Sequence, residues 1–344
     1  MNEAMKVYID NAKNRHMIWR SYHTHPPIIY VPRNEARLCH FIGSVPKHNR
    51  KPFIKDIEHV LFTRGLSRDY VARLKQAPRV EREFHGENCK AVFVFCDSCL
   101  RQVADHIDTT GIEDKLHIVL PAYPNQADKI YGHSGPFRLL TISNKFWGRG
   151  IHLAIEVFRN LRGKYGNDVR MTLVCDSVPA DYPLVDGLEL IGAHRLKNSL
   201  LHKLYSEADV FLLLGLIDSG TVLEAMAYGV PTVGTPNFDR GGWILPGQTG
   251  FVVEAPFHIY DASFGIEWKT FKEFQGIVKA RFERGELSYM VTEATAHVET
   301  LINNPDQLKT MGQQAQKHQR RKHSFKYHNA QVRQIYADIL SGML

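Results

Sequence analysis

The 344-residue sequence contains no apolar stretch that approaches the length of a membrane-spanning helix. Its longest strongly apolar run, residues 210–217 (VFLLLGLI), has eight residues, whereas a helix that crosses a bilayer needs about 20. The first residues also lack the apolar core of a signal peptide. Since 44% of the residues are hydrophobic, as in ordinary globular chains, we expect a folded protein of the cytoplasm.

Cysteine is scarce as well, with five residues in the chain, which excludes a disulfide framework. Two of them, Cys96 and Cys99, form a C-x-x-C motif that fits a zinc site, a redox pair or two buried core residues. The motif directly follows the apolar run 91–95. Because cysteine is commonly buried after such a run, the core interpretation is favoured.

Basic residues exceed acidic ones by 43 to 36, which gives a net charge of +7. The excess lies in residues 1–80, with 15 basic and 6 acidic residues, while the remaining 28 basic and 30 acidic residues nearly cancel. This placement indicates an anionic partner: a membrane surface, nucleic acid or a phosphorylated substrate. A second basic run, 317–323, is interpreted as the solvated face of a helix.

Short β-branched and aromatic runs alternate with amphipathic stretches in two successive series. This alternation predicts an α/β fold with two doubly wound, Rossmann-like domains facing each other across a cleft. The expected strands are 6–9, 53–57, 91–95 and 117–120 in the first series and 137–142, 170–175, 210–214 and 231–234 in the second. The expected helices are 98–106, 150–162, 199–206, 222–228, 292–303, 305–318 and 327–340. Residues 1–128 form the expected N-terminal domain, 129–136 a polar linker, and 137–325 the C-terminal domain.

The segment 218–231 (DSGTVLEAMAYGVP) lies where an apolar strand ends and a short helix begins. In doubly wound sheets, ligands bind at the carboxyl ends of strands. Glycine permits close approach of a ligand to the backbone, the helix start favours phosphate, and the two carboxylates accept hydrogen bonds from sugar and ribose hydroxyls. An acidic residue in a first helical turn is also common for structural reasons alone. The candidate ligand-binding residues of this segment are Asp218, Ser219, Gly220, Thr221, Val222 and Glu224.

The same segment resembles the donor-site signature of retaining GT-B glycosyltransferases of the GT4-like group. In that group a Glu-x7-Glu pattern runs into an Ala-Met-Ala-x-Gly-x-Pro helix and strand. Further similarity lies at 146–155 (FWGRGIHLAI), 204–212 (LYSEADVFL), 247–253 (GQTGFVV) and in the C-terminal tail, and it is thinner before residue 137. The resemblance implies a GT-B fold in which a C-terminal helix, residues 326–344, packs back towards the N-terminal domain.

The resemblance also implies a role for each matching residue. Glu224 would hold the nucleotide ribose, while Arg149 and Lys145 would neutralise the donor diphosphate as negative charge develops on it. His59 would lie near the reacting sugar, although a core or loop histidine is an equally good interpretation. Asp218 would take the place of the first signature glutamate, with the spacing shortened to Asp-x5-Glu. Catalysis without a metal or bound cofactor is implied, and the sequence has no Asp-x-Asp motif.

Three residues depart from the family pattern. Leu216 occupies the position of the first glutamate, Asn144 replaces an arginine, and Gly242 replaces a glutamate. These departures keep open a catalytically inactive, sugar-nucleotide-binding partner subunit. Basicity alone suggests a nucleic-acid-binding protein, but no nucleic-acid-binding motif is present and no such partner is expected.

The sequence therefore predicts a retaining glycosyltransferase that moves a sugar from a nucleotide diphosphate sugar to a hydroxyl acceptor. Synthesis of a polysaccharide, lipopolysaccharide or glycolipid is implied, with a saccharide or lipid-linked acceptor. Residues 1–80 are expected to contact an anionic acceptor or the acidic inner face of the membrane. The expected donor-binding residues are Asn144, Lys145, Arg149, Ser219, Gly220, Thr221, Val222 and Glu224.

Overall fold

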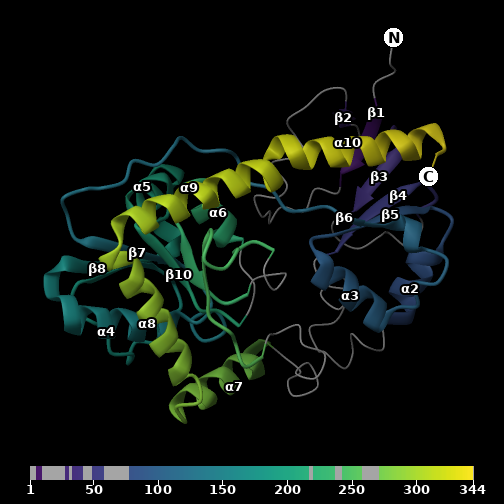
Figure 1. Cartoon of the computed structure of the whole chain (residues 1–344). Coiled ribbons are helices and arrows are strands. Elements are labelled where there is room, and N and C mark those ends of the chain that lie inside the picture. Colours follow the sequence, from purple (N-terminus) through teal and green to yellow (C-terminus); the bar gives the residue numbers. More distant parts are fainter. Residues whose placement is uncertain are drawn as a thin grey trace. The chain divides into compact units, whose positions relative to one another are not determined.

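The computed structural model describes residues 5–9, 28–30, 33–41, 49–57, 77–216, 220–236, 242–257 and 271–343. The chain divides into two compact units (Figure 1). The first unit comprises residues 1–124 and 322–344, and the second comprises residues 125–321. Each unit contains its own six-stranded sheet in which every strand pair is parallel. The α/β class expected from the sequence is therefore confirmed.

The sheet of the first unit has the strand order β2-β1-β3-β4-β5-β6. Helix α10 covers one face, and α2 and α3 cover the other (Figure 1). Tyr336 and Ile339 of α10 pack against Leu38 and Phe93 in the core, so the C-terminal helix belongs to this unit. Its elements are β1 (Met5–Ile9), β2 (Ile28–Tyr30), β3 (Leu38–Phe41), β4 (Phe53–Ile57), α2 (Ala77–His85), β5 (Cys89–Val94), α3 (Asp97–His106), β6 (Leu116–Ile118) and α10 (Phe325–Ser341).

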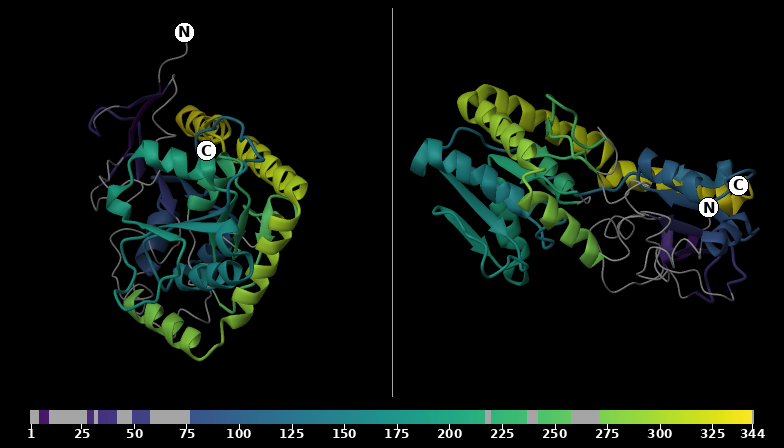
Figure 2. Two further views of the ribbon diagram at one scale, coloured as in Figure 1. Left: turned by 90° about the vertical axis from the view of Figure 1, so that its left-hand side faces the viewer. Right: turned by 90° about the horizontal axis from the view of Figure 1, so that it is seen from below.

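The sheet of the second unit has the order β12-β11-β10-β7-β8-β9. In Figure 1, α5 and α6 lie on one face and α4 with α8 on the other, while Figure 2 shows α7, α8 and α9 following one another around the outside of this unit. Its strands are β7 (Phe137–Ile142), β8 (Val169–Val174), β9 (Leu188–Ile191), β10 (Val210–Leu213), β11 (Thr232–Gly234) and β12 (Gly250–Val252). Its helices are α4 (Ile151–Tyr165), α5 (Asn198–Glu207), α6 (Thr221–Ala227), α7 (Phe271–Glu283), α8 (Ser288–Asn303) and α9 (Pro305–Lys322).

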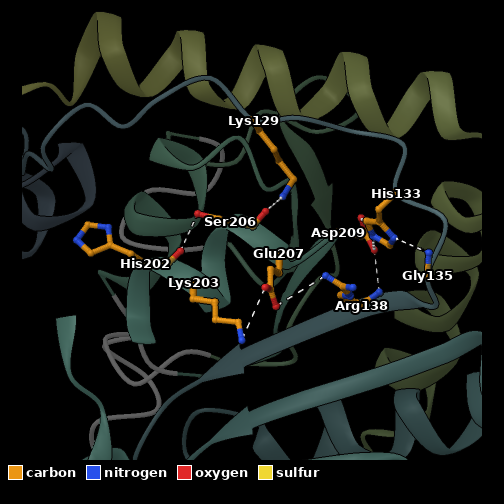
Figure 3. Close-up of polar contacts among 9 residues, drawn as sticks. All are labelled: Lys129, His133, Gly135, Arg138, His202, Lys203, Ser206, Glu207 and Asp209. Carbon is orange, nitrogen blue, oxygen red and sulfur yellow. Dashed lines mark hydrogen bonds and ion pairs between the residues drawn. The ribbon is translucent and has the colours of Figure 1, made fainter. Parts of the chain in front are cut away.

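The segment 129–136, where we expected a linker, is hydrogen-bonded to the second unit (Figure 3). The Lys129 ammonium donates to the carbonyl of Ser206 at the end of α5 (2.7 Å). His133 Nε2 lies 3.0 Å from the carboxylate of Asp209, which directly precedes β10. These contacts hold the segment along the second unit between α5 and the start of β10.

The central strands coincide closely with the predicted ones, since β7 and β10 begin at the expected residues. In the part of the chain that the structure describes, no helix combines the length and the apolar composition that crossing a membrane requires.

Candidate functional site

The sequence of the second unit reverses its direction of winding between two central strands. From β7 the chain continues through β8 to β9 at one edge, and from β10 through β11 to β12 at the other. The two strands pair in parallel, with Leu140 opposite Phe211, so their carboxyl ends lie side by side. Ligands of doubly wound sheets bind at such a switch point. The loops after β7 and β10 carry the residues that the sequence analysis assigned to the donor site.

Backbone and side-chain contacts fix the loop that follows β7. The Ser177 hydroxyl donates to the carbonyl of Asn144 (2.9 Å) and accepts from the N–H of Phe146 (3.3 Å). The N–H of Leu216, just beyond β10, donates to the carbonyl of Gly148 (3.0 Å). The loop is therefore joined to the chain that follows each neighbouring strand.

Gly150 allows the closest approach in this loop. Its φ of +64° is a left-handed conformation that favours glycine, and a Cβ atom would lie 2.0 Å from the carbonyl oxygen of Leu214. Any larger residue would push the loop away from β10. The turn that carries the predicted cations is thus set directly against the strand that leads to α6.

The predicted cations share one turn. The N–H of Arg149 donates to the carbonyl of Lys145 (2.8 Å), so both side chains leave the same short loop before α4. Lys145 and Asn144 are exposed, whereas Arg149 is half-buried. A half-buried guanidinium and an exposed ammonium at a switch point are suited to binding an anion with several oxygens, because both are donors with permanent positive charge at neutral pH.

Helix α6 begins at Gly220, whose carbonyl accepts from the N–H of Leu223 (3.1 Å). A Cβ atom on Gly220 would meet no atom of the described chain within 4 Å, and its φ of −62° is open to every residue. Neither packing nor backbone conformation therefore requires glycine here. The absence of a side chain leaves space beside Thr221 and Val222, the first two residues of the helix.

Glu224 lies in α6 and is only 6% exposed. Burial raises the pKa of its carboxyl to about 7, and a hydrogen bond from the Tyr205 hydroxyl opposes this shift. The same hydroxyl donates to the carbonyl of Thr221 (3.4 Å). The ring of Tyr205 stacks on Tyr228 with centroids 5.2 Å apart. Tyr205, on α5, therefore connects both the backbone and the carboxyl of α6.

Three predicted residues, His59, Asp218 and Ser219, lie outside the described residues. Leu216 is fully buried, so its side chain packs in the core. Sequence reasoning missed Ser177 and Tyr205. Tyr205 stands within the family-like stretch 204–212, but its contact with Glu224 becomes visible only when α5 and α6 are placed together.

The first unit holds a second group of buried polar side chains. His40 on β3 bonds through Nε2 to the carboxylate of Asp56 on β4 and through Nδ1 to the hydroxyl of Tyr336 on α10, both at 2.5 Å. All three residues are at most 4% exposed. These contacts satisfy both ring nitrogens and hold α10 on the sheet, which is a structural role.

Comparison with known proteins agrees with the geometry of the second unit. Residues 136–262 match the family model described as Glycosyl transferases group 1. No curated protein sequence matches the chain. The chain thus carries a glycosyl transferases group 1 domain, located in the unit that contains the switch point.

Solved structures resemble the whole chain at low sequence identity. Anabaena HepE in complex with UDP-glucose has a TM-score of 0.62 at 12% identity, over 98% of this chain and 99% of HepE. The pneumococcal O-GlcNAc transferase GtfA in complex with UDP and GlcNAc has 0.60 at 12%, over 88% of this chain and 57% of GtfA. For S. aureus TarM the values are 0.58 and 13%, over 87% and 55%. The chain spans little more than half the length of GtfA and TarM, and the likeness establishes the GT-B glycosyltransferase fold.

Proposed function

We propose that the chain is a retaining glycosyltransferase whose second unit binds a nucleotide diphosphate sugar. The observation that carries this proposal is the turn from Lys145 to Gly150, which is held against the end of β10 at the switch point. It presents two cations beside the chain that leads to the buried carboxyl of Glu224. HepE and GtfA were solved with UDP or UDP-glucose bound, which supports a uridine nucleotide as the first ligand to test.

In the proposed reaction the acceptor hydroxyl attacks the anomeric carbon and the bond from that carbon to the diphosphate oxygen breaks. The electron pair leaves with the nucleoside diphosphate, and the hydroxyl proton passes to a phosphate oxygen of the leaving group. Arg149 and Lys145 stabilise the charge that develops on the diphosphate. Glu224 accepts hydrogen bonds from the ribose diol, and Gly220, Thr221 and Val222 contact the donor through their backbone. Roles near the transferred sugar remain predictions for His59, Asp218 and Ser219.

The test is calorimetric titration of UDP and UDP-glucose into the wild type and two pairs of variants. Glu224→Gln and Arg149→Ala change the proposed site. Glu189→Gln and Arg170→Ala change exposed residues on β9 and β8 of the same sheet. We expect the first pair to lose binding and the second to retain it. Equal affinities for all five proteins, or no binding of any nucleotide sugar by the wild type, would reject the donor site.

Turnover is tested separately from binding. Release of UDP from UDP-glucose with a panel of saccharide acceptors measures transfer, and the anomeric proton coupling of the product reports retention or inversion. Donor binding without release of nucleotide for any acceptor would favour the inactive partner subunit that Asn144 and Leu216 suggest.

The acceptor is proposed to be anionic or lipid-linked because the basic excess lies in residues 1–80. Each Lys or Arg near an anionic surface contributes about 1 kcal/mol to attraction. We expect the protein to sediment with vesicles that contain phosphatidylserine and not with neutral vesicles. Failure to sediment with either would remove the membrane from the proposal and leave a water-soluble acceptor.

A further inference from the structure

The C-x-x-C motif lies at the start of α3, in the first unit. Cys96 is the N-terminal cap of this helix and has an extended backbone, with φ of −170° and ψ of 173°. Its carbonyl accepts the first helical hydrogen bond, from the N–H of Leu100 (3.1 Å). Cys99 lies in the first turn. The two residues are 2% and 4% exposed.

The two sulfur atoms are in direct contact. Cys96 Sγ and Cys99 Sγ are 3.4 Å apart, within hydrogen-bonding distance for sulfur. A disulfide bond is about 2.05 Å long, so joining them requires a movement of a little over 1 Å by two side chains of one helical turn. Loop closure is not a barrier because the residues are only three positions apart.

The local field also favours the reactive form. A helix start lowers the pKa of a nearby thiol because its N–H groups stabilise negative charge, and thiolates are the species that react with oxidants. The other cysteines differ. Burial raises the pKa of the Cys89 thiol to about 12, and burial also raises that of Cys39. Cys175 is held by contacts of its sulfur with the N–H and hydroxyl of Ser177.

The sequence left a zinc site, a redox pair and buried core residues as interpretations of this motif. Within the described part of the chain, no group of three or more His, Cys, Asp or Glu side chains is arranged to hold a metal ion. Two thiols in contact, without further ligands of that kind, fit a redox pair better than a zinc site.

We propose that Cys96 and Cys99 are a thiol–disulfide modification site, oxidised by small peroxides. The thiolate of one cysteine attacks a peroxide oxygen of hydrogen peroxide, the O–O bond breaks, and a sulfenic acid and water form. The second thiol attacks the sulfenic sulfur, forms the S–S bond and releases a second water. Two thiols lose two hydrogen atoms and one peroxide is reduced to two waters. The disulfide would join the cap to the first turn of α3, where β5 ends.

The test uses the full-length protein and one tryptic peptide. Residues 91–101 (AVFVFCDSCLR) follow Lys90 and end at Arg101, so this peptide contains both cysteines of the motif and no other. Reduced protein is treated with hydrogen peroxide, denatured, alkylated, digested and measured by mass spectrometry. We expect the peptide to appear two hydrogens lighter and unalkylated, and to become alkylatable again after dithiothreitol.

The peptides with Cys39, Cys89 and Cys175 are internal controls that should remain alkylated. Cys96→Ser and Cys99→Ser should each abolish the lighter peptide, whereas Cys175→Ser should not. If the native protein oxidises all five cysteines alike, or peptide 91–101 stays fully alkylated when the others react, the proposal is wrong. Stoichiometric zinc in the purified protein, measured by mass spectrometry of the metal, would equally overturn it. None of these readouts depends on glycosyl transfer.

Discussion

The two units bury titratable side chains in different ways. In the first, His40 has a partner at each ring nitrogen, the carboxylate of Asp56 and the hydroxyl of Tyr336. In the second, the carboxyl of Glu224 is buried with the Tyr205 hydroxyl as its partner, and among the described residues no cation contributes to its pKa. Both groups lie on central elements of parallel sheets.

This difference separates a structural group from a site. Buried polar groups that satisfy one another fix the packing of an element, here α10 on its sheet. A buried carboxyl without a counter-charge lowers stability and keeps its hydrogen-bonding capacity for something else. Glu224 is of the second kind, and its pKa of about 7 expresses the missing partner.

The largest effect is expected for Asp56→Ala in the first unit. Removal of the carboxylate leaves a buried histidine nitrogen without its acceptor, and loss of one partner of a buried pair costs about 3 kcal/mol. Chemical denaturation should show this loss for Asp56→Ala, a smaller one for Asp56→Asn, and almost none for Asp105→Ala, an exposed carboxylate on α3. Equal stabilities for Asp56→Ala and Asp105→Ala would remove the structural role of the His40 group.

Arg149→Ala is expected to affect catalysis rather than stability. Loss of a group that stabilises developing charge lowers kcat by about 100- to 1,000-fold, and the half-buried side chain contributes little to the core. UDP release during transfer measures the rate, with Arg170→Ala as the matched arginine control. A rate for Arg149→Ala within twofold of the control would show that the turn after β7 does not contact the diphosphate.

The sequence predicts the second unit better than the first for a physical reason. Strands β7 and β10 are buried and almost wholly apolar, so their residues alone identify them. Strand β3 (LCHF) was missed because it is short and contains His40, whose partner Tyr336 lies 296 positions further along the chain. Strand β9 is partly exposed at the sheet edge, without the alternation that indicates a half-buried strand.

The candidate site shows the same limit. The cations of the loop after β7 and Glu224 were identified from local motifs, because charge type and position along the chain are sequence properties. The contacts that hold them were not. Ser177 joins two loops, and Tyr205 joins two helices, so both depend on packing between segments that no local pattern records.

Glu224→Gln is expected to stabilise the protein at neutral and higher pH. The pKa of Glu224 is raised from 4.5 to about 7 in the folded state, so the folded protein binds this proton more tightly than the unfolded chain. Stability is therefore unaffected below about pH 4.5, falls as the pH rises towards about 7, and stays lower above it. A shift of this size corresponds to about 3 kcal/mol at pH 8.

Denaturation of the wild type and Glu224→Gln at pH 5 and pH 8 checks this sign. The stability difference should be small at pH 5 and favour the variant at pH 8, with Glu189→Gln showing no such change. A variant that is less stable than the wild type at pH 8 would mean that a charged Glu224 has a stabilising partner, and the contrast between the two units would fail.

The smallest effect is expected for Tyr205→Phe, which removes a hydroxyl from Glu224. Binding of the ribose diol to a carboxylate should weaken as the pH falls through about 7 in the wild type. Loss of a hydrogen bond of about 1 kcal/mol to the charged form moves this midpoint upward by about 0.7 pH units. UDP-glucose is the better probe, since the terminal phosphate of UDP itself titrates near pH 6. Tyr228→Phe, which lacks a contact with Glu224, should keep the wild-type midpoint, and a common shift in both variants would assign the effect to packing of the stacked rings.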